Sequence, residues 1–304
     1  MANLGAKARD YILACNPIGF RGASTAIIAG MAARAIADKV IIITGASSGI
    51  GRAAALALGR ERAKLVLAAR REHLLKELEG EIQRAGGTAV TMVMDLREKD
   101  QVEKVIRSTR DQFGRIDILI NNAGFGFYGS VENTPASIVQ EMFDLNFQAP
   151  LVACQLAIPI MRTQGRGHII NVSSVAGKRG LPLSGIYCAT KFALNGISEA
   201  LRLELKDSGI DVSLINPAAT QTEFADNVRY GDVTAKFKPL GHIQSAEDVA
   251  AAIVRCIKAP KTEVYPYRLS RLLVWANAVA PSLVDKVLMR FLRARLRARA
   301  NGST

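Results

Sequence analysis

The sequence predicts an α/β fold, with a doubly wound, mostly parallel sheet and helices on both of its faces. Between Lys39 and Pro266, short runs rich in β-branched residues alternate with longer segments of helical periodicity. Several of the short runs are apolar almost throughout, as strands are when a parallel sheet is covered on both sides. This alternation is typical of parallel strands joined by right-handed crossovers through helices.

The strand candidates are spread along this whole region. They are residues 39–44, 64–69, 88–94, 116–121, 167–173, 210–216 and 262–266. Amphipathic patterns between them predict helices over Glu72–Ala85, Glu98–Phe113 and Gly185–Lys206. The sequence contains neither an internal repeat nor a low-complexity linker, so a single domain is expected over residues 38–266.

Two segments flank this domain. Residues 1–37 are rich in Ala and Gly and are expected to form an N-terminal extension that is partly disordered. Their run Ala23–Ala33 is too short to cross a bilayer and makes a poor secretory signal. Translation from Met31 and an organelle-targeting peptide are both open alternatives. Residues 267–304 are expected to form a helical, basic tail.

The tail combines apolar and basic residues. An apolar stretch, Leu269–Ala280, precedes a helical pattern that begins at Ser282. One face of this second helix carries Leu283, Val284, Val287, Leu288, Phe291 and Leu292. Basic residues occupy most of the other face, so residues 282–299 are suited to peripheral contact with an anionic membrane surface, or equally to a partner subunit.

The net charge is +13, and six of the excess positive charges lie between Lys286 and Arg299, where there is no acid. The rest are spread over the chain, with no zinc finger, helix-turn-helix or RNA-binding signature. A solvated basic tail is therefore favoured, and no nucleic-acid partner is expected.

The cysteines and histidines indicate neither a disulfide frame nor a metal site. The four cysteines (Cys15, Cys154, Cys188 and Cys256) are far apart and form no CxxC pair. The three histidines are equally scattered. We expect no metal, and a reducing, cytoplasmic location.

A glycine-rich turn follows the first predicted strand. Residues 44–51 read TGASSGIG and lead into an alanine-rich helix. Such a turn brings bare backbone against a pyrophosphate at a helix N-terminus, where unpaired amides and the helix dipole attract negative charge. The candidate cofactor-binding residues here are Gly45, Ser47, Ser48, Gly49, Ile50 and Gly51.

The residues after the second predicted strand favour NADP(H) over NAD(H). Arg70 and Arg71 follow this strand, and no acid occurs before Glu72. In sheets of this type an acid at this place binds the free ribose 2′-hydroxyl, whereas a guanidinium suits a 2′-phosphate. We therefore predict that Arg70 binds the 2′-phosphate.

A candidate acid/base pair lies in the motif YCATK. Tyr187 and Lys191 are four residues apart in a predicted helix, which puts them on one helical face. A free tyrosine has a pKa of about 10, and a nearby ammonium should lower it. Ser174, at the end of a predicted strand, could hydrogen-bond a substrate oxygen at the carboxyl edge of the sheet. Its neighbour Ser173 is a rival for this role.

Asparagines follow other predicted strands. Residues 121–124 read NNAG, and Asn146 lies further on, in DLNF. A buried loop asparagine usually satisfies backbone groups, and we favour this structural role for Asn122.

These motifs together closely resemble those of the short-chain dehydrogenase/reductase family. The resemblance covers about residues 38–225. Its pieces are TGASSGIG (44–51), Asp95, NNAG (121–124), Asn146, Ser174, YCATK (187–191) and the run from Asn216-Pro217 onward. It implies a seven-stranded sheet of the Rossmann type and an oxidoreductase that exchanges hydride with a nicotinamide cofactor. It also implies a homodimer or homotetramer.

The resemblance assigns roles to individual residues. It implies a catalytic tetrad in which Tyr187 is the acid/base, Lys191 binds the nicotinamide ribose and lowers the pKa of the tyrosine, and Asn146 anchors a proton-relaying water. Ser174 completes the tetrad. It further implies cofactor contacts by Asp95, Leu96, Asn121, Ala123, Gly124, Pro217 and Thr222. Ala218 departs from the glycine usual in the family, which puts the local loop geometry in doubt.

The substrate is expected to be a hydrophobic carbonyl compound or secondary alcohol, such as a steroid-, retinoid- or acyl-like molecule. The residues expected on the substrate side are mostly apolar: Phe125, Phe127, Tyr128, Leu181, Leu183 and the loop from Phe224 to Lys238. Two alternatives remain open, a scaffold that binds NADP(H) without turnover and a membrane-surface protein that uses the basic tail.

Overall fold

The computed structural model describes residues 33–224, 228–232 and 243–300, with side chains up to residue 290. Among these residues, seven strands form one sheet in the order β11-β7-β6-β4-β1-β2-β3, and every neighbouring pair is parallel. From Arg34 onward the chain forms one compact unit. The predicted doubly wound sheet is confirmed, while the alternatives concerning residues 1–32 lie outside the described residues.

All seven predicted strands belong to this sheet. Their bounds are β1 (Val40–Thr44), β2 (Lys64–Ala69), β3 (Thr88–Val93), β4 (Ile118–Asn121), β6 (Gly167–Val172), β7 (Ile210–Ile215) and β11 (Glu263–Val264). β4 starts two residues later than predicted. The reason is that the backbone N–H and carbonyl of Ile116 bond the side chain of Gln164 instead of a neighbouring strand.

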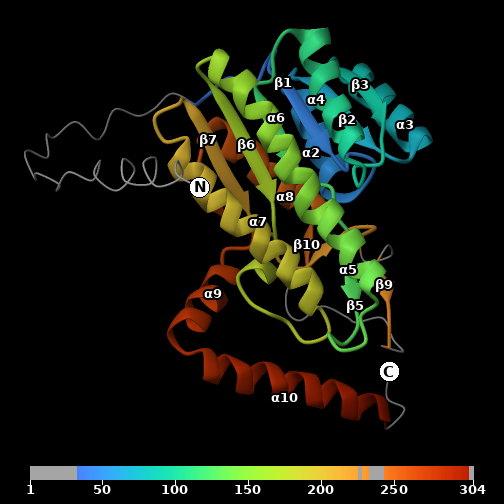
Figure 1. Ribbon diagram of the computed structural model, residues 1–304, viewed down its shortest axis with the longest axis vertical. Coiled ribbons are helices and arrows are strands. Elements are labelled where there is room, and N and C mark those ends of the chain that lie inside the picture. Colours follow the sequence, from blue (N-terminus) through green and yellow to red (C-terminus); the bar gives the residue numbers. More distant parts are fainter. Residues whose placement is uncertain (1–32, 225–227, 233–242, 301–304) are drawn as a thin grey trace, which may run out of the picture. The chain divides into compact units, whose positions relative to one another are not determined.

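Side chains along each strand point alternately into the two halves of the core. On β1, Ile41 and Ile43 face one hydrophobic cluster and Ile42 faces the other, and all three are fully buried. The first cluster is covered by α2 (Gly49–Arg60), α3 (Glu72–Arg84) and α8 (Ala246–Lys258). The second is covered by α4 (Lys99–Phe113), α6 (Ala149–Thr163) and the end of α7 (Gly185–Glu204); α6 and α7 lie over the near face of the sheet in Figure 1.

Shorter elements gather near the carboxyl edge of the sheet. α5 (Ala136–Phe143) runs through a π-helical turn, η1 (Asp144–Gln148), into α6. A short 3₁₀ turn, η2 (Val175–Gly177), follows β6. Two small parallel pairs, β5 (Phe127–Tyr128) with β9 (Arg229–Tyr230) and β8 (Thr220–Gln221) with β10 (Gln244–Ser245), bring the later loops to this edge.

The tail is helical, as predicted, and forms α9 (Ser270–Val279) and α10 (Pro281–Ala300). Both helices lie at the lower end of Figure 1, below the sheet. The Arg179 guanidinium, which follows η2, donates hydrogen bonds to Asn277 of α9 and Asp285 of α10. These bonds tie the tail to the loop after β6.

Residues just before position 38 also pack on the domain. Ile36 is buried in the first hydrophobic cluster, and the Arg34 amide donates to the Lys258 carbonyl. The last residues of the predicted extension therefore pack on the sheet.

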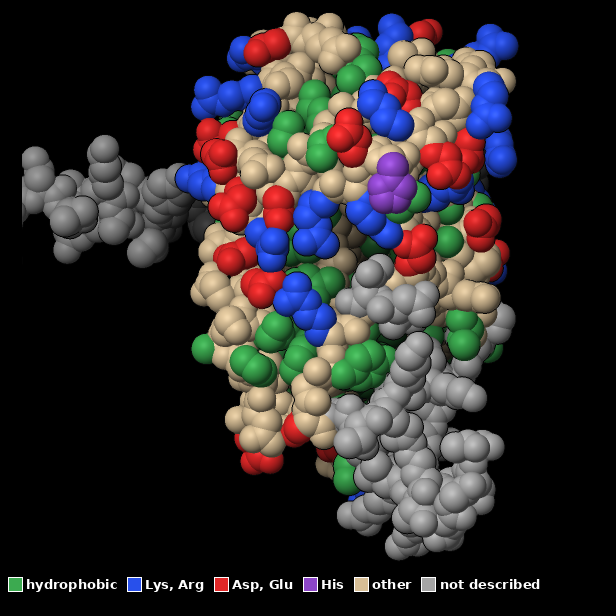
Figure 2. All heavy atoms as spheres, turned by 90° about the vertical axis from the view of Figure 1, so that its right-hand side faces the viewer, with side chains coloured by type: hydrophobic (Ala, Val, Ile, Leu, Met, Phe, Trp, Pro, Cys, Tyr) green, Lys and Arg blue, Asp and Glu red, His purple; other side chains and the backbone are tan. Residues whose placement is uncertain are grey.

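Charged side chains are mixed on the side of the molecule that Figure 2 shows, where Lys and Arg are interspersed with Asp and Glu and hydrophobic side chains are more frequent toward the lower end. Many of the cations form ion pairs, such as Arg52 with Glu81 and Arg97 with Glu141. None of the helices in the described part of the chain has the length and apolar character needed to cross a bilayer.

Candidate active site

A cavity of about 850 Å³ opens at the carboxyl edge of the sheet. It lies where the loops after β1, β2, β3, β4, β6 and β7 come together, as ligand sites do in open parallel sheets. Most of the residues selected from the sequence line it: Gly45, Ser47, Ser48, Gly49, Ile50, Arg70, Asp95, Leu96, Ala123, Gly124, Ser174, Tyr187, Lys191, Pro217 and Thr222. Gly51, Asn121 and Asn146 are not among the lining residues.

The glycine-rich turn forms a cradle of bare backbone at the start of α2. Gly45 and Gly49 have φ of 65° and 54°, which only glycine adopts without strain. A Cβ on Gly51 would lie 2.3 Å from the Gly45 carbonyl oxygen and 2.6 Å from Nδ2 of Asn122. Gly51 therefore allows the turn to close and does not line the cavity.

The cradle fits the pyrophosphate of a dinucleotide. Ser48, the residue before α2, makes no side-chain cap to the helix, so the first amides of α2 remain available to an anion. Ser47 and Ile50 line the cavity beside them. Glycine at positions 45 and 49 keeps side chains away from this end of the helix.

Asn122 has the structural role predicted for it. Its side-chain amide donates to the carbonyls of Thr44 and Gly45, and its own N–H donates to the Thr44 hydroxyl. These bonds join the end of β4 to the turn after β1.

The side chain of Asn121, which was expected beside the cofactor, does not line the cavity. Its side chain is buried and donates to Oδ1 of Asn171 on the neighbouring β6, at 2.8 Å. The pleat of β4 turns it into the sheet, so the side chain that reaches the cavity is that of Asn122.

Two arginines follow β2 at the cavity wall. Arg70 is exposed and lines the cavity. Arg71 donates to the Ser47 hydroxyl in the cradle at 3.2 Å and pairs with Glu223 at 2.8 Å. The sequence-based prediction selected Arg70 as the arginine that binds the 2′-phosphate, but Arg71 is the arginine whose side chain contacts the cradle. A third arginine near the cradle, Arg52 of α2, forms an ion pair with Glu81 of α3.

A chain of ion pairs crosses the adjacent wall. Arg97 bonds Asp95 at 2.6 Å and Glu141 at 2.7 Å, and Arg229 binds the same Glu141. The hydrogen bond from Arg97 holds the pKa of Asp95 below its ordinary value. Sequence reasoning missed Arg97, Glu141 and Arg229, because residues far apart in the chain form this network.

Tyr187, Lys191 and Ser174 come together on the cavity floor. The Lys191 ammonium lies 5.9 Å from the centre of the Tyr187 ring and donates to the Val172 carbonyl at 3.0 Å. The Ser174 side chain hydrogen-bonds the Tyr187 phenol. The buried Ser173 hydroxyl is 3.5 Å from the Lys191 carbonyl, so Ser174 is the serine beside the tyrosine.

Burial shifts the pKa values of both Tyr187 and Lys191. Burial raises the pKa of the Tyr187 phenol, and the bond with Ser174 lowers it less than burial raises it. Burial also lowers the pKa of Lys191 to about 8. Loss of solvent is therefore the largest influence on both groups, whereas the sequence-based expectation rested on the attraction of the nearby ammonium.

Asn146 lies in the π-helical turn η1 and is fully buried. Its Oδ1 accepts from the Phe125 amide, and its Nδ2 donates to the Phe125 carbonyl and to the Thr190 hydroxyl. Both ends of its amide group thus bind the loop after β4, and one end also binds α7. In this structure the side chain positions that loop.

Thr222 lies beside the cradle. A Cβ on Gly49 would come within 3.0 Å of the Thr222 side chain. The carbonyl of Ala218, at the place usually held by glycine, accepts a hydrogen bond from the Thr220 hydroxyl.

The predicted substrate side is only partly correct. Phe125, Tyr128 and Leu181 line the cavity, as does Phe224. Phe127 instead is buried under Gly129 and Gly231, because β5 turns alternate side chains inward. Leu183 also lies outside the lining, with a φ of 63°. Within the predicted loop, residues 225–227 and 233–238 lie outside the described residues.

The tail supplies lining residues that were not expected from the sequence. Tyr267, Leu269, Ser270, Leu273, Val274 and Leu288 all border the cavity. A sequence pattern can identify α9 and α10 as helices, but it cannot say which part of the sheet they cover.

The model of the short chain dehydrogenase family matches residues 39–232, from the first strand through β9. The chain belongs to this family. It is therefore an oxidoreductase, and the resemblance seen in its motifs is confirmed.

Known relatives extend this likeness beyond the matched region. Ketoacyl reductase HetN from Nostoc is 32% identical over 263 residues, which cover 84% of this chain and 90% of that protein. A short-chain dehydrogenase/reductase from Burkholderia phymatum, solved with NAD, is 28% identical with a TM-score of 0.74 and covers 82% and 96% of the two chains. L-Sorbose reductase from Gluconobacter frateurii, solved with NADPH and L-sorbose, is 28% identical with a TM-score of 0.67 and covers 75% and 95%.

The substitution Gly51→Ala should destabilise the protein. Its Cβ would collide with the backbone of the cradle, so we expect the free energy of unfolding to fall by about 1–3 kcal/mol, measured by urea denaturation. Gly80→Ala is the matched control, because a Cβ at this helical glycine meets no atom within 4 Å. The control should be neutral or slightly stabilising. Equal losses in the two variants would contradict the close approach at Gly51.

Proposed function

We propose that this enzyme is an NADP(H)-dependent oxidoreductase that interconverts a hydrophobic carbonyl compound and its secondary alcohol. The observation that carries the proposal is the grouping of Tyr187, Ser174 and Lys191 on the floor of the cavity that the glycine cradle opens into. Residues 38–266 would be the catalytic domain, and residues 267–304 a helical tail that completes its cavity.

The proton chemistry assigns roles to two hydroxyls. A bound nicotinamide cofactor would supply the hydride for reduction of the carbonyl carbon. Tyr187 donates its phenolic proton to the carbonyl oxygen, a role that suits a phenol whose raised pKa keeps it protonated at neutral pH. Ser174 donates a hydrogen bond to the same oxygen as negative charge develops on it. In the oxidation of an alcohol the proton moves back to Tyr187.

Lys191 and Asn146 support the tyrosine. The Lys191 ammonium stabilises the phenolate that remains when the proton has left, because the site around it is buried. It can also reach a ribose hydroxyl of the cofactor. Asn146 is proposed to act as a positioning residue through its bonds to Phe125 and Thr190.

The proposed cofactor contacts follow the cavity wall. The cradle residues Gly45, Ser47, Ser48, Gly49 and Ile50 would bind the pyrophosphate, with Gly51 holding the turn closed. Asp95 and Leu96 would border the adenine. Asn121, Ala123 and Gly124 would border the ribose, with Asn121 limited to its backbone. Pro217 and Thr222 would border the nicotinamide, together with Tyr187 and Lys191.

Arg70 and Arg71 support the preference for NADP(H). Both follow β2 at the cavity wall, and the next acid, Glu72, is not among the residues that line the cavity. Two guanidinium groups there provide charged donors for a 2′-phosphate, and the carboxylate that would bind a 2′-hydroxyl is not found directly after β2.

The substrate side supports an apolar substrate. The wall beyond Tyr187 is built from Phe125, Tyr128, Leu181, Phe224, Val228, Leu269, Leu273, Val274 and Leu288. Steroid-, retinoid- and acyl-like compounds all fit this character. The acyl class has additional support, because the relative HetN is named a ketoacyl reductase.

The proposal also includes the oligomeric state of the protein and its location in the cell. Two exposed apolar side chains on α7, Phe192 and Leu203, support a homodimer or homotetramer built on this helix. We propose a cytoplasmic protein that touches membranes peripherally through residues 282–299.

The substitution Tyr187→Phe should abolish most of the turnover. Loss of the proton donor is expected to reduce kcat by about 10²–10⁴-fold in a panel of hydrophobic ketones followed by NADPH oxidation. Binding of NADPH, measured by calorimetry, should remain within a few-fold of the wild type. Full activity in the variant would remove Tyr187 from the chemistry. A wild-type protein that binds NADPH and reduces none of the panel would instead favour the scaffold alternative.

The substitution Arg70→Asp should shift the cofactor preference. Removing a charge-assisted contact and adding a repulsive carboxylate should lower the NADPH/NADH ratio of kcat/KM by about 10–100-fold. Arg60→Asp, at the exposed end of α2, makes the same change in net charge away from the cavity and should leave the ratio unchanged. An unchanged ratio in Arg70→Asp would contradict the assignment.

The reduction rate should fall as the pH rises through about 8. Burial lowers the pKa of Lys191 to about 8, so its positive charge is present below that pH and lost above it. Without this charge the developing phenolate is less stable, and kcat/KM should drop by about tenfold per pH unit beyond the midpoint. Lys191→Arg keeps its charge and should move the fall to higher pH. A wild-type profile that stays level through this range would contradict the role of Lys191.

A further inference from the structure

The helix α9 presents an apolar row to solvent. Leu272, Trp275, Ala276 and Val279 are spaced as i, i+3, i+4 and i+7, the spacing with which a helix ordinarily packs on a core. The large side chains of this row are 65%, 68% and 78% exposed. A helix whose core-like face is turned to water lacks a partner for that face.

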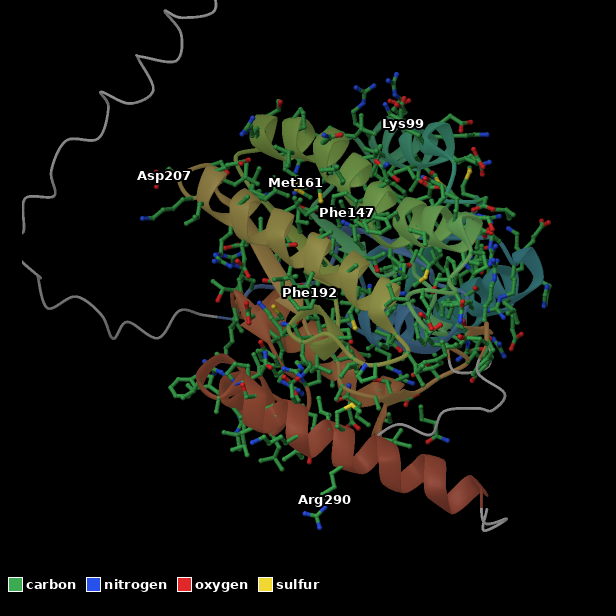
Figure 3. The ribbon with its side chains drawn as sticks, turned by 60° about the horizontal axis from the view of Figure 1, so that its bottom comes forward. Lys99, Phe147, Met161, Phe192, Asp207 and Arg290 are labelled. Atoms are coloured by element: carbon green, nitrogen blue, oxygen red, sulfur yellow. The ribbon has the colours of Figure 1, made fainter. Side chains whose placement is uncertain are left out.

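The helix α10 extends this surface. Leu283 and Val287 are 62% and 46% exposed, while Val284 on the inner side of the same helix is 6% exposed. Lys286 and Arg290 are exposed too, and Figure 3 shows Arg290 projecting from α10 away from the rest of the domain. The outer side of α10 therefore combines apolar and cationic groups. We call the exposed residues of α9 and α10 named so far the outer face.

The inner sides of the same two helices border the active-site cavity. Leu273 and Val274 of α9 and Leu288 of α10 line it. Arg179, which also lines the cavity, bonds both helices. One thin layer of helix thus separates the outer face from the cavity.

The charge around the outer face is positive. Between Pro266 and Arg290 the sequence contains Arg268, Arg271, Lys286 and Arg290 against the single acid Asp285, which pairs with Arg179. The sequence then continues with four more arginines and no acid up to Arg299. Such a surface attracts an anionic partner.

A second copy of this chain fits the outer face poorly. A symmetric contact would bring the same patch of both copies together and set Arg271, Lys286 and Arg290 against their equivalents. Like charges that face each other across an interface cost free energy. An anionic lipid surface instead complements these charges, and its interface is where tryptophan partitions most favourably.

We propose that α9 and α10 dock the enzyme on an anionic membrane surface, with Leu272, Trp275 and Val279 inserted at the level of the lipid headgroups. This moves the main apolar anchor from the tail residues 282–299 to α9. Docking would place the wall of the cavity against the bilayer, so that an apolar substrate could enter from the lipid; this last step rests on the proposed function. The contacts resemble those of other amphipathic helices that lie in the interface.

Trp275 allows a direct test, because it is the single tryptophan of the chain. The full-length protein is mixed with vesicles of phosphatidylcholine containing phosphatidylserine, and with vesicles of phosphatidylcholine alone. We expect the Trp275 emission to shift to the blue with the anionic vesicles and to be quenched by bromine-labelled lipid. The shift should weaken at high salt. An emission that stays unchanged with anionic vesicles at low salt overturns the proposal.

Variants that keep Trp275 as the fluorescent probe allow a second test. Leu272→Ser/Val279→Ser should weaken binding to anionic vesicles by about tenfold or more, since it removes two inserted side chains. Val93→Ser, an exposed valine at the end of β3, is the matched control for Val279→Ser and should bind as the wild type does. Equal binding by the double variant and the wild type overturns the proposal. A double variant that instead changes the oligomeric state in light scattering, with no vesicle effect, assigns the outer face to self-association.

The same samples separate this proposal from the proposed function. Turnover of a water-soluble ketone without vesicles should be unaffected in Leu272→Ser/Val279→Ser, because neither side chain lines the cavity. Tyr187→Phe should lose turnover and still bind vesicles. Loss of vesicle binding in Tyr187→Phe as well would contradict docking by α9 and α10.

Discussion

The burial of the parallel sheet on both faces is the constraint from which the rest of the structure follows. Its neighbouring strands all run the same way, so their carboxyl ends meet at one edge. Helices on both faces close the sides and leave that edge as the place where polar loops can gather. The cradle after β1, the arginines after β2 and Ser174 after β6 therefore border one cavity although they are far apart in the chain.

Close backbone contacts hold this edge together. The side chain of Asn122 binds the Thr44 and Gly45 carbonyls, and Gly51 leaves room for it. On the other side of the cavity, Asn146 joins the loop after β4 to α7, the helix that carries Tyr187 and Lys191. Two asparagine side chains thus set the distance between the cradle and the candidate acid/base pair.

The sequence predicts the parts of this site that depend on local pattern. Apolar runs identify every strand of the main sheet, and the spacing of Tyr187 and Lys191 on one helix brings them together. Contacts between distant segments cannot be predicted in this way. The binding of Arg71 to Ser47, the ion pairs of Arg97 and the cavity wall formed by α9 each join segments whose own sequence patterns do not show the contact. Local pattern does not show which side chains of β4 and β5 face the cavity, because a one-residue change along a strand turns a side chain to the opposite face, as at Asn121 and Phe127. The effect of burial on the pKa of Tyr187 likewise depends on the complete fold.

We expect one cavity to bind cofactor and substrate together. A crystal structure of the full chain with bound NADPH tests this expectation most directly. The predicted result has the pyrophosphate on the amides at the start of α2, the 2′-phosphate in contact with Arg70 or Arg71, and the nicotinamide ring beside Tyr187. A 2′-phosphate held away from both arginines would contradict the proposed preference for NADP(H). A nicotinamide ring bound far from Tyr187 would contradict the account as a whole.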